Sequence, residues 1–202
     1  MPATWPVTLR HDDIELRPLR LRDEREWRAV RKRNADWLAP WDASLPPEGR
    51  SEGEIPPTFS AMVRRLKREA RAGTMLPWVL AYQGRFAGQV TVGGISRGSL
   101  RSAYIGYWID SAVAGRGIMP TAVAMACDYA FAELHLHRIE VNIRPENAAS
   151  LRVVDKLGLA YEGERKKYLH INGEWCDHLT YVVFSDDMPD GVLANFLARR
   201  GH

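Results

Sequence analysis

The chain has 202 residues, with 28 Lys and Arg against 25 Asp and Glu, a formal net charge of +3 and 46% hydrophobic residues. Such a chain is typical of one globular domain with its own core, and this composition excludes disordered and collagen-like classes. No apolar stretch approaches the roughly 18 residues of a membrane helix, and the N-terminus lacks a signal peptide's apolar centre. We therefore expect a cytoplasmic protein with no membrane partner, whose small net charge does not predict direct nucleic-acid binding.

The N-terminal part of the chain predicts a strand followed by a helix. Residues 12–18 alternate between apolar and polar side chains, as a half-buried strand does. Residues 23–33 have helical spacing, with Asp23 as the expected N-cap and Trp27 and Val30 on one face.

A long loop rich in aromatic residues is expected next. Five prolines interrupt residues 34–57, while Trp37 and Trp41 supply large apolar groups. Loops of this length in compact domains are usually functional or disordered, and the two tryptophans favour a loop that packs or covers a ligand. Thr58 then caps a helix that reaches about residue 72.

The second half predicts a mostly antiparallel sheet crossed by helices. The expected strands are residues 76–82, 86–95, 103–109, 137–144, 161–171 and 179–184. The expected helices run from the glycine loop to about residue 134, from Asn147 to Gly158, and over residues 190–200. The resulting order, β-αα-βββ-α-β-α-ββ, is a mixed α+β fold.

The glycine loop before the first of these helices, residues 114–119, is the most informative segment. Gly115 and Gly117 allow close backbone approach, and the free N–H groups of a helix start attract anions, so a phosphate or diphosphate suits this place. Arg116 adds a formal positive charge. The same pattern also occurs as a plain strand-to-helix connection, and it lacks the GxxxxGK[ST] pattern of a nucleotide P-loop.

Several further segments carry a family resemblance. They are Arg17-Pro18-Leu19, Leu38-Ala39-Pro40-Trp41, Ile105-Gly106-Tyr107-Trp108-Ile109, and Asn147-Ala148-Ala149-Ser150 with the following Lys156-Leu157-Gly158. With the glycine loop, they make the chain from Ile14 to about Phe184 resemble the GNAT superfamily of acyl-CoA N-acyltransferases. The resemblance is closest to the bacterial ribosomal-protein-alanine N-acetyltransferases, the Rim type.

The resemblance implies that residues 1–202 form one acetyltransferase domain that uses acetyl-CoA as co-substrate and no metal. The loop would bind the diphosphate through backbone amides, and the pantetheine arm would lie where the strand at Trp108 splays from the strand at 141–143. Ala114 and Met119 depart from the usual Gln/Arg and Gly/Ala of the family loop. The implied coenzyme-binding residues are Trp108, Ile109, Ala114, Gly115, Arg116, Gly117, Ile118, Met119, Asn147 and Ser150.

Ser150 and Asn147 are the candidate catalytic residues. The resemblance places Ser150 beside the coenzyme sulfur, where its hydroxyl would hydrogen-bond the departing thiolate. Alternatively, Asn147 only caps the helix and Ser150 only occupies the third helical position of a capping box. Tyr161 and Tyr168 are rival proton donors.

No general base is evident, because Leu169 stands where some Rim-type relatives carry a glutamate. A protein α-amine is roughly 10% neutral at pH 7 and a lysine amine about 0.04%. A protein N-terminus therefore depends less on a general base than a lysine side chain does.

The expected acceptor is therefore the N-terminal α-amine of a protein, such as a ribosomal protein. Its groove would lie between Trp37 and Trp41 on one side and Tyr168 and Trp175 on the other. Acetylation of a small amine or a lysine side chain, or a non-catalytic module that binds coenzyme A or RNA, remain alternatives. The sequence leaves monomer and homodimer open.

Overall fold

The computed structural model of the chain describes residues 5–46 and 58–200. The strands are β1 (Leu9–His11), β2 (Ile14–Pro18), β3 (Leu76–Tyr82), β4 (Arg85–Ser96), β5 (Ser102–Ile109), β6 (Arg138–Ile143), β7 (Ala160–Ile171) and β8 (Glu174–Phe184). The α-helices are α1 (Glu24–Arg33), α2 (Ala35–Leu38), α3 (Phe59–Arg71), α4 (Ile118–Ala132), α5 (Ala148–Leu157) and α6 (Val192–Arg200). Short 3-10 turns are η1 (Leu21–Asp23), η2 (Ala39–Trp41) and η4 (Ser111–Val113).

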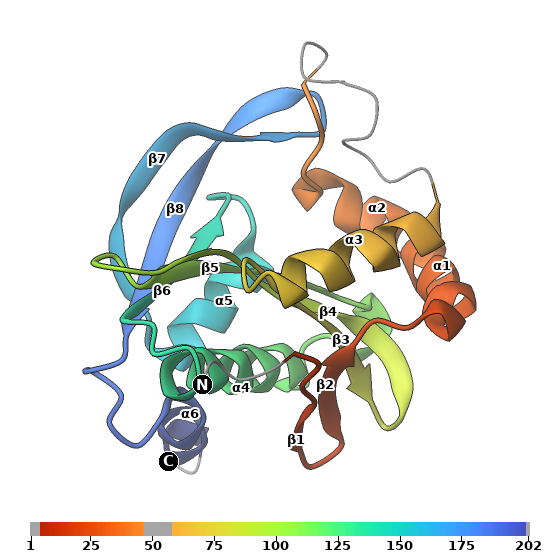
Figure 1. Ribbon diagram of the computed structural model, residues 1–202. Coiled ribbons are helices and arrows are strands. Elements are labelled where there is room, and N and C mark those ends of the chain that lie inside the picture. Colours follow the sequence, from red (N-terminus) through yellow and green to blue (C-terminus); the bar gives the residue numbers. More distant parts are fainter. Residues whose placement is uncertain (1–4, 47–57, 201–202) are drawn as a thin grey trace.

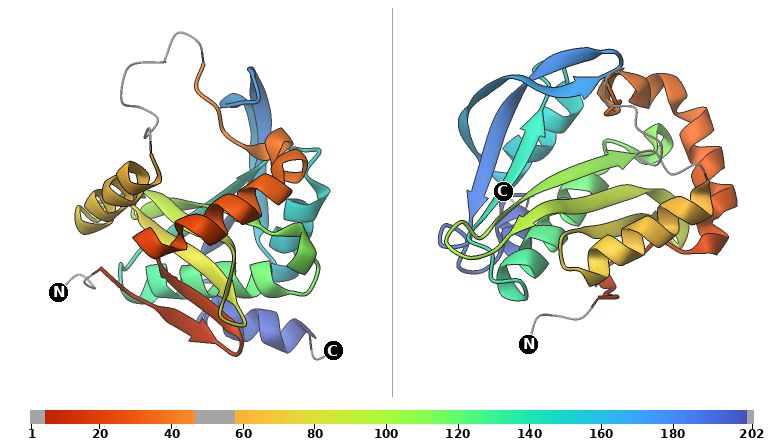
Figure 2. Two further views of the ribbon diagram at one scale, coloured as in Figure 1. Left: turned by 90° about the vertical axis from the view of Figure 1, so that its right-hand side faces the viewer. Right: turned by 45° about the horizontal axis from the view of Figure 1, so that its top comes forward.

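Within the described residues, the strands form one eight-stranded sheet in the order β1-β2-β3-β4-β5-β6-β8-β7 (Figure 1). Its neighbouring strands are antiparallel except β5 and β6, which are parallel. The predicted mixed α+β class and its mostly antiparallel sheet are confirmed. Helices α4, α5 and α6 lie on one side of the sheet, and α1, α2 and α3 lie on the other (Figures 1 and 2).

Helix α4 lies at the centre of the larger core. It packs between the sheet and α6, and twelve of its fifteen residues are buried. A helix covered on both sides is apolar all round, which explains the uninterrupted apolar run of residues 122–127. Cys127 is fully buried there, as predicted, and burial raises the pKa of its thiol.

The predictions for the N-terminal part were correct only in part. The expected strand at 12–18 is present as β2 but begins at Ile14, because Asp12 takes a positive φ of 47° in the turn that joins β2 to the unpredicted strand β1. The expected loop from residue 34 contains α2 and η2, and its remainder, residues 47–57, lies outside the described residues. Asp23 precedes α1 but does not cap it with its side chain.

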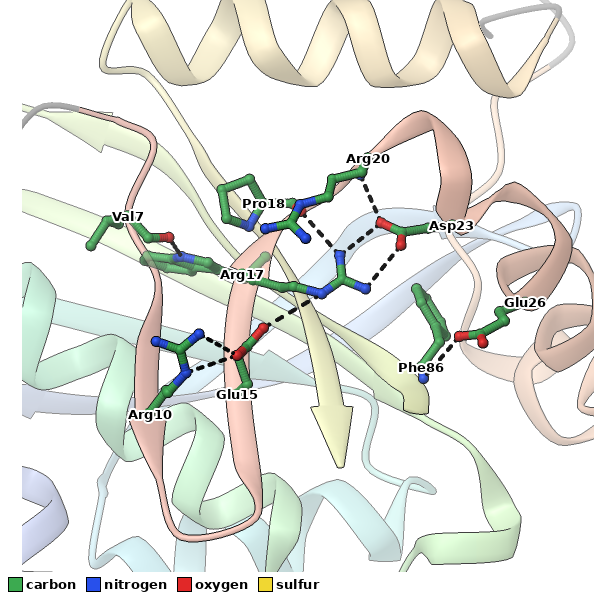
Figure 3. Close-up of polar contacts among 10 residues, drawn as sticks. Val7, Arg10, Glu15, Arg17, Pro18, Arg20, Asp23, Glu26 and Phe86 are labelled. Carbon is green, nitrogen blue, oxygen red and sulfur yellow. Dashed lines mark hydrogen bonds and ion pairs between the residues drawn. The ribbon is translucent and has the colours of Figure 1, made fainter. Parts of the chain in front are cut away.

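The Asp23 carboxylate instead anchors the connection between β2 and α1 (Figure 3). The Arg17 guanidinium donates two hydrogen bonds to it, of 2.8 and 2.9 Å, and the Arg20 backbone N–H donates a third at 2.7 Å. Asp23 is 5% exposed and the Arg17 side chain 11%. Farther along α1, the Glu26 carboxylate accepts the Phe86 N–H of β4 at 3.2 Å, which fixes α1 on the sheet.

The predicted caps of two other helices are confirmed. Thr58 Oγ1 accepts the Ala61 N–H at the start of α3, and Asn147 Oδ1 accepts the Ser150 N–H at the start of α5. Gly158 follows α5 in the left-handed conformation, with a φ of 71° that suits glycine. The last predicted strand was too short, since β8 begins at Glu174 and forms a long hairpin with β7.

The parallel pair β5 and β6 is short. It joins residues 102–104 to residues 138–140 and stops after Tyr104 and Glu140. Beyond this point β5 continues to Ile109 on β4, and β6 continues to Ile143 on β8, so the two strands separate. The splay implied by the resemblance is therefore present.

We predict that Asp23→Ala lowers the free energy of unfolding by about 3 kcal/mol, because it leaves Arg17 without its buried partner. Urea denaturation measures the loss. Arg28→Ala, which breaks the exposed pair with Glu24, is the matched control and should cost less than about 1 kcal/mol. Equal losses in the two variants would contradict the assignment of Asp23 as an anchor.

Candidate functional site

A cavity of about 770 Å³ lies beside the end of β5, beyond the last residue of β5 that pairs with β6. Its wall combines the end of β5, the glycine loop with the start of α4, the start of α5, and α2 with η2. It includes Trp37, Trp41, Gln89, Tyr107, Trp108, Ile109, Ala114, Gly115, Gly117, Met119, Asn147 and Ser150. Segments that are far apart in the sequence thus meet at one place.

The glycine loop forms part of the wall of this cavity. Gly115 and Gly117 both have a φ of 81°, a conformation that L side chains rarely adopt. Gly117 is the N-cap of α4 and provides no side-chain cap, and the first turn holds no acidic residue. The first backbone bond of the helix is from the Thr121 N–H to the Gly117 carbonyl, so the N–H groups of Ile118 and Met119 stay available.

This donor set suits a diphosphate. Free amides at the positive end of a helix that is apolar and fifteen residues long bind anions without a cationic side chain. Pro120 lies in the first turn, where its missing N–H removes no intrahelical bond. Met119 is 5% exposed and belongs to the core, although part of it reaches the cavity wall.

Asp110 holds the loop in place. Its carboxylate accepts hydrogen bonds from Asn34 at 2.8 Å and from the Ala112 N–H at 3.3 Å, and it forms an ion pair with Arg33. Asn34 in turn accepts the Ser111 N–H at 2.9 Å. Burial alone would raise the pKa of Asp110, but the bonds from Arg33, Asn34 and Ala112 outweigh burial and lower it.

At the start of α5, the Ser150 hydroxyl is left without a partner. Asn147 caps the helix through the backbone N–H of Ser150, and within the described part of the chain the Ser150 Oγ makes no hydrogen bond. Tyr107 donates its hydroxyl to the Ser150 carbonyl at 3.5 Å. Burial raises the pKa of Tyr107 above its ordinary value, which is already well above 7, so this phenol stays protonated at neutral pH.

The segment around Trp37 and Trp41 lines the cavity, and contacts with Arg31 and Arg144 hold it in place. Arg31 pairs with Asp42 and lies over the Trp108 ring, 5.2 Å from its centroid. Arg144 donates to the Pro40 carbonyl at 3.1 Å and lies 5.8 Å from the centroid of the Trp41 ring.

Of the predicted site residues, ten line this cavity. They are Trp37, Trp41, Trp108, Ile109, Ala114, Gly115, Gly117, Met119, Asn147 and Ser150. Ile118 is buried under the loop, and Arg116 lines a smaller neighbouring cavity.

Tyr168 and Trp175 lie on the β7–β8 hairpin and are not among the residues of the cavity wall. The hairpin tip nonetheless touches the segment after Trp41, because Ser44 bonds to His170 through its backbone N–H and its hydroxyl, both at 2.9 Å. Figure 1 shows this hairpin arching toward α2. Tyr161, one of the two rival proton donors, is 58% exposed and pairs with Tyr181.

Sequence reasoning missed two residues as site members. Tyr107 is the phenol beside Ser150, and Gln89 accepts the indole N–H groups of both Trp27, at 2.9 Å, and Trp108, at 3.2 Å. The signal for Gln89 was a polar residue inside a largely buried strand. Tyr107 gave no such signal, because a tyrosine in a strand is ordinary.

Within residues 5–46 and 58–200, no three His, Cys, Asp or Glu side chains gather as a metal site would need. No helix in those two stretches has the length and apolar character to span a bilayer.

Comparisons with known proteins identify relatives. A family model described as the acetyltransferase (GNAT) domain matches residues 13–160. A probable N-acetyltransferase of Bacillus subtilis, YjcK, is 46% identical over 103 residues, which cover 51% of this chain and 57% of that protein. The [ribosomal protein uS5]-alanine N-acetyltransferase of Escherichia coli is 35% identical over 104 residues, 52% of this chain and 54% of that protein. The chain thus spans little more than half the length of these curated relatives.

A solved structure is similar over nearly the whole chain. RimJ of Mycobacterium smegmatis, in complex with CoA-disulfide, has a TM-score of 0.85 and 35% sequence identity, and the match covers 96% of this chain and 95% of that one.

We predict that Asp110→Asn destabilises the protein at pH 7 and that the difference from the wild type shrinks in acid. Because the pKa of Asp110 is lowered from its ordinary value of 3.8, its stabilisation is complete above that value and is lost as pH falls through the folded pKa. Urea denaturation of both proteins at pH 7 and pH 3 checks this. A difference that stays constant or grows at pH 3 would contradict it.

Proposed function

Because the chain belongs to the GNAT acetyltransferase family, we propose that it transfers the acetyl group of acetyl-CoA to the α-amine of a protein N-terminus. The amine attacks directly, while coenzyme and acceptor are both bound. The observation that carries the proposal is the uncapped start of α4, which opens into the same cavity as the unpartnered Ser150 hydroxyl.

Each part of the cavity suits one part of the coenzyme. The amides of the glycine loop bind the diphosphate. Past Tyr104 and Glu140, β5 and β6 no longer pair with each other, and the freed backbone groups can bond the amides of the pantetheine arm as a peptide would.

The coenzyme supplies an activated acetyl thioester, and the chain supplies the polar groups around it. In this proposal, the Ser150 hydroxyl donates a hydrogen bond to the departing sulfur. Tyr107 bonds to the Ser150 carbonyl and so supports the position of Ser150. The cap from Asn147 fixes the first turn of α5 through the backbone alone, which leaves the Ser150 hydroxyl for substrate.

The acceptor side of the cavity fits a peptide with a single amine. Trp37 and Trp41 offer flat apolar surface at low entropy cost. Three carboxylates line this wall, Asp36, Asp42 and Glu146, and two of them are already paired, Asp42 with Arg31 and Glu146 with Arg144. So little free negative charge suits one ammonium group better than a polyamine.

The relative from Escherichia coli is named for the N-terminal alanine of ribosomal protein uS5, and this supports a ribosomal protein as the acceptor. Such a partner would place the enzyme in the cytoplasm. An α-amine with a pKa near 7.8 also needs less help from a base than a lysine side chain does.

We predict that the protein acetylates peptides with N-terminal alanine on the α-amine when it is given acetyl-CoA. Mass spectrometry locates the acetyl group, and a peptide blocked at its N-terminus but containing lysine is the control. Faster acetylation of the blocked peptide, or of spermidine, would reject the α-amine assignment.

We further predict that Ser150→Ala lowers kcat roughly 10- to 100-fold, because a hydrogen bond to a charged group contributes about 1.5–3 kcal/mol. The Kd for acetyl-CoA should change little. Alanine keeps the backbone N–H that Asn147 caps, so the variant separates the hydroxyl from the cap. Ser185→Ala, in the bend after β8, is the control. If Ser150→Ala has the same kcat as the wild type, the Ser150 hydroxyl has no catalytic role.

A further inference from the structure

A second cavity, of about 470 Å³, borders the glycine loop. Its wall consists of Gly115, Arg116, Gly117, Asp155, Lys156, Phe196, Arg199 and Arg200. Gly115, Gly117 and Lys156 also line the larger cavity, so the loop is a shared wall between the two. A ligand bound to the loop amides can therefore extend into both.

Positive charge dominates this second cavity. Four cationic side chains line it against one carboxylate, that of Asp155. Arg116 bonds to the Ala112 carbonyl and Arg199 to the Asn195 amide, both neutral acceptors. In the part of the chain that the structure describes, none of the four cations forms an ion pair. Clustered cations without counterions favour binding of an anion.

Helix α6 brings two of these cations to the loop. The Asp128 carboxylate of α4 accepts the N–H groups of Val192 and Leu193, at 2.6 and 3.1 Å, and so anchors the start of α6. From there α6 runs back along α4 toward the glycine loop (Figure 2). Nine residues rise about 13 Å, close to the distance along α4 from Asp128 to its first turn.

The far end of α6 accordingly contacts the loop. A Cβ placed on Gly117 would lie 3.2 Å from a guanidinium nitrogen of Arg200. Arg200 also packs on the Phe196 ring, 5.6 Å from its centroid, while Arg199 packs against Gly158 at the end of α5. Both arginines lie outside residues 13–160, which the family model covers.

We propose that Arg199 and Arg200, together with Arg116 and Lys156, bind the 3′-phosphate of the coenzyme's adenosine. The inference rests on the proposed function, since it takes acetyl-CoA as the donor. Coenzyme A continues past its diphosphate, on the side away from the pantetheine, into an adenosine with a 3′-phosphate. A phosphate monoester carries close to two negative charges at pH 7, and guanidinium groups match its oxygens in geometry and charge.

The test compares coenzyme A with 3′-dephospho-coenzyme A by calorimetry, in the wild type and in an Arg199→Ala/Arg200→Ala variant. The wild type should bind dephospho-coenzyme A roughly 10- to 100-fold more weakly than coenzyme A. The variant should bind coenzyme A about as weakly, and should bind dephospho-coenzyme A as the wild type does.

Arg22→Ala/Arg25→Ala is the matched control, because it removes the same charge from exposed positions on the other side of the sheet. It should keep the preference for the 3′-phosphate. An Arg199→Lys/Arg200→Lys variant should keep part of it, which shows that α6 remains docked.

Two results would overturn the inference: no preference for coenzyme A in the wild type, or an equal loss of affinity for both ligands in the alanine variant. Failure of the wild type to bind either ligand would instead contradict the proposed function, and the inference would fall with it.

Discussion

The early end of the pairing between β5 and β6 is the constraint on which the rest of the site depends. Because hydrogen bonding stops after Tyr104 and Glu140, two strands in the middle of a sheet each present an unpaired edge. The starts of α4 and α5 both line the cavity together with the part of β5 that no longer pairs with β6. A continuous sheet would bury these polar groups against each other and leave no place for an extended ligand.

The polar network around Asp110 joins α1 to the loop that leads into α4. Asn34, at the end of α1, bonds to the Asp110 carboxylate after β5 and to the backbone at Ser111, so a helix on one side of the sheet holds the loop that begins α4 on the other. Gly115 and Gly117 then give the backbone a conformation that other residues rarely adopt. The amides of α4 are thus in position before any ligand arrives, which reduces the entropy cost of binding.

Features that depend on residues close together in the chain, such as helix caps, could be predicted from the sequence. The caps at Thr58 and Asn147 and the glycine that ends α5 follow from short patterns, and the structure confirms them. Asp23 shows the limit of such patterns: it stands where a cap is expected, but Arg17 takes its carboxylate. The splay came only from family resemblance. Contacts between distant segments, such as Gln89 with Trp27 or Arg200 with Gly117, leave no local pattern to find.

The central claim is that free amides at the start of α4 bind the diphosphate of the acetyl donor. Calorimetric titration of the wild-type protein with 3′-dephospho-coenzyme A, which keeps the diphosphate but lacks the 3′-phosphate, and with pantetheine, which lacks both, tests it most directly. The account predicts saturable heat with 3′-dephospho-coenzyme A and none with pantetheine at the same concentrations. Equal binding of the two, or no heat with 3′-dephospho-coenzyme A, would contradict it.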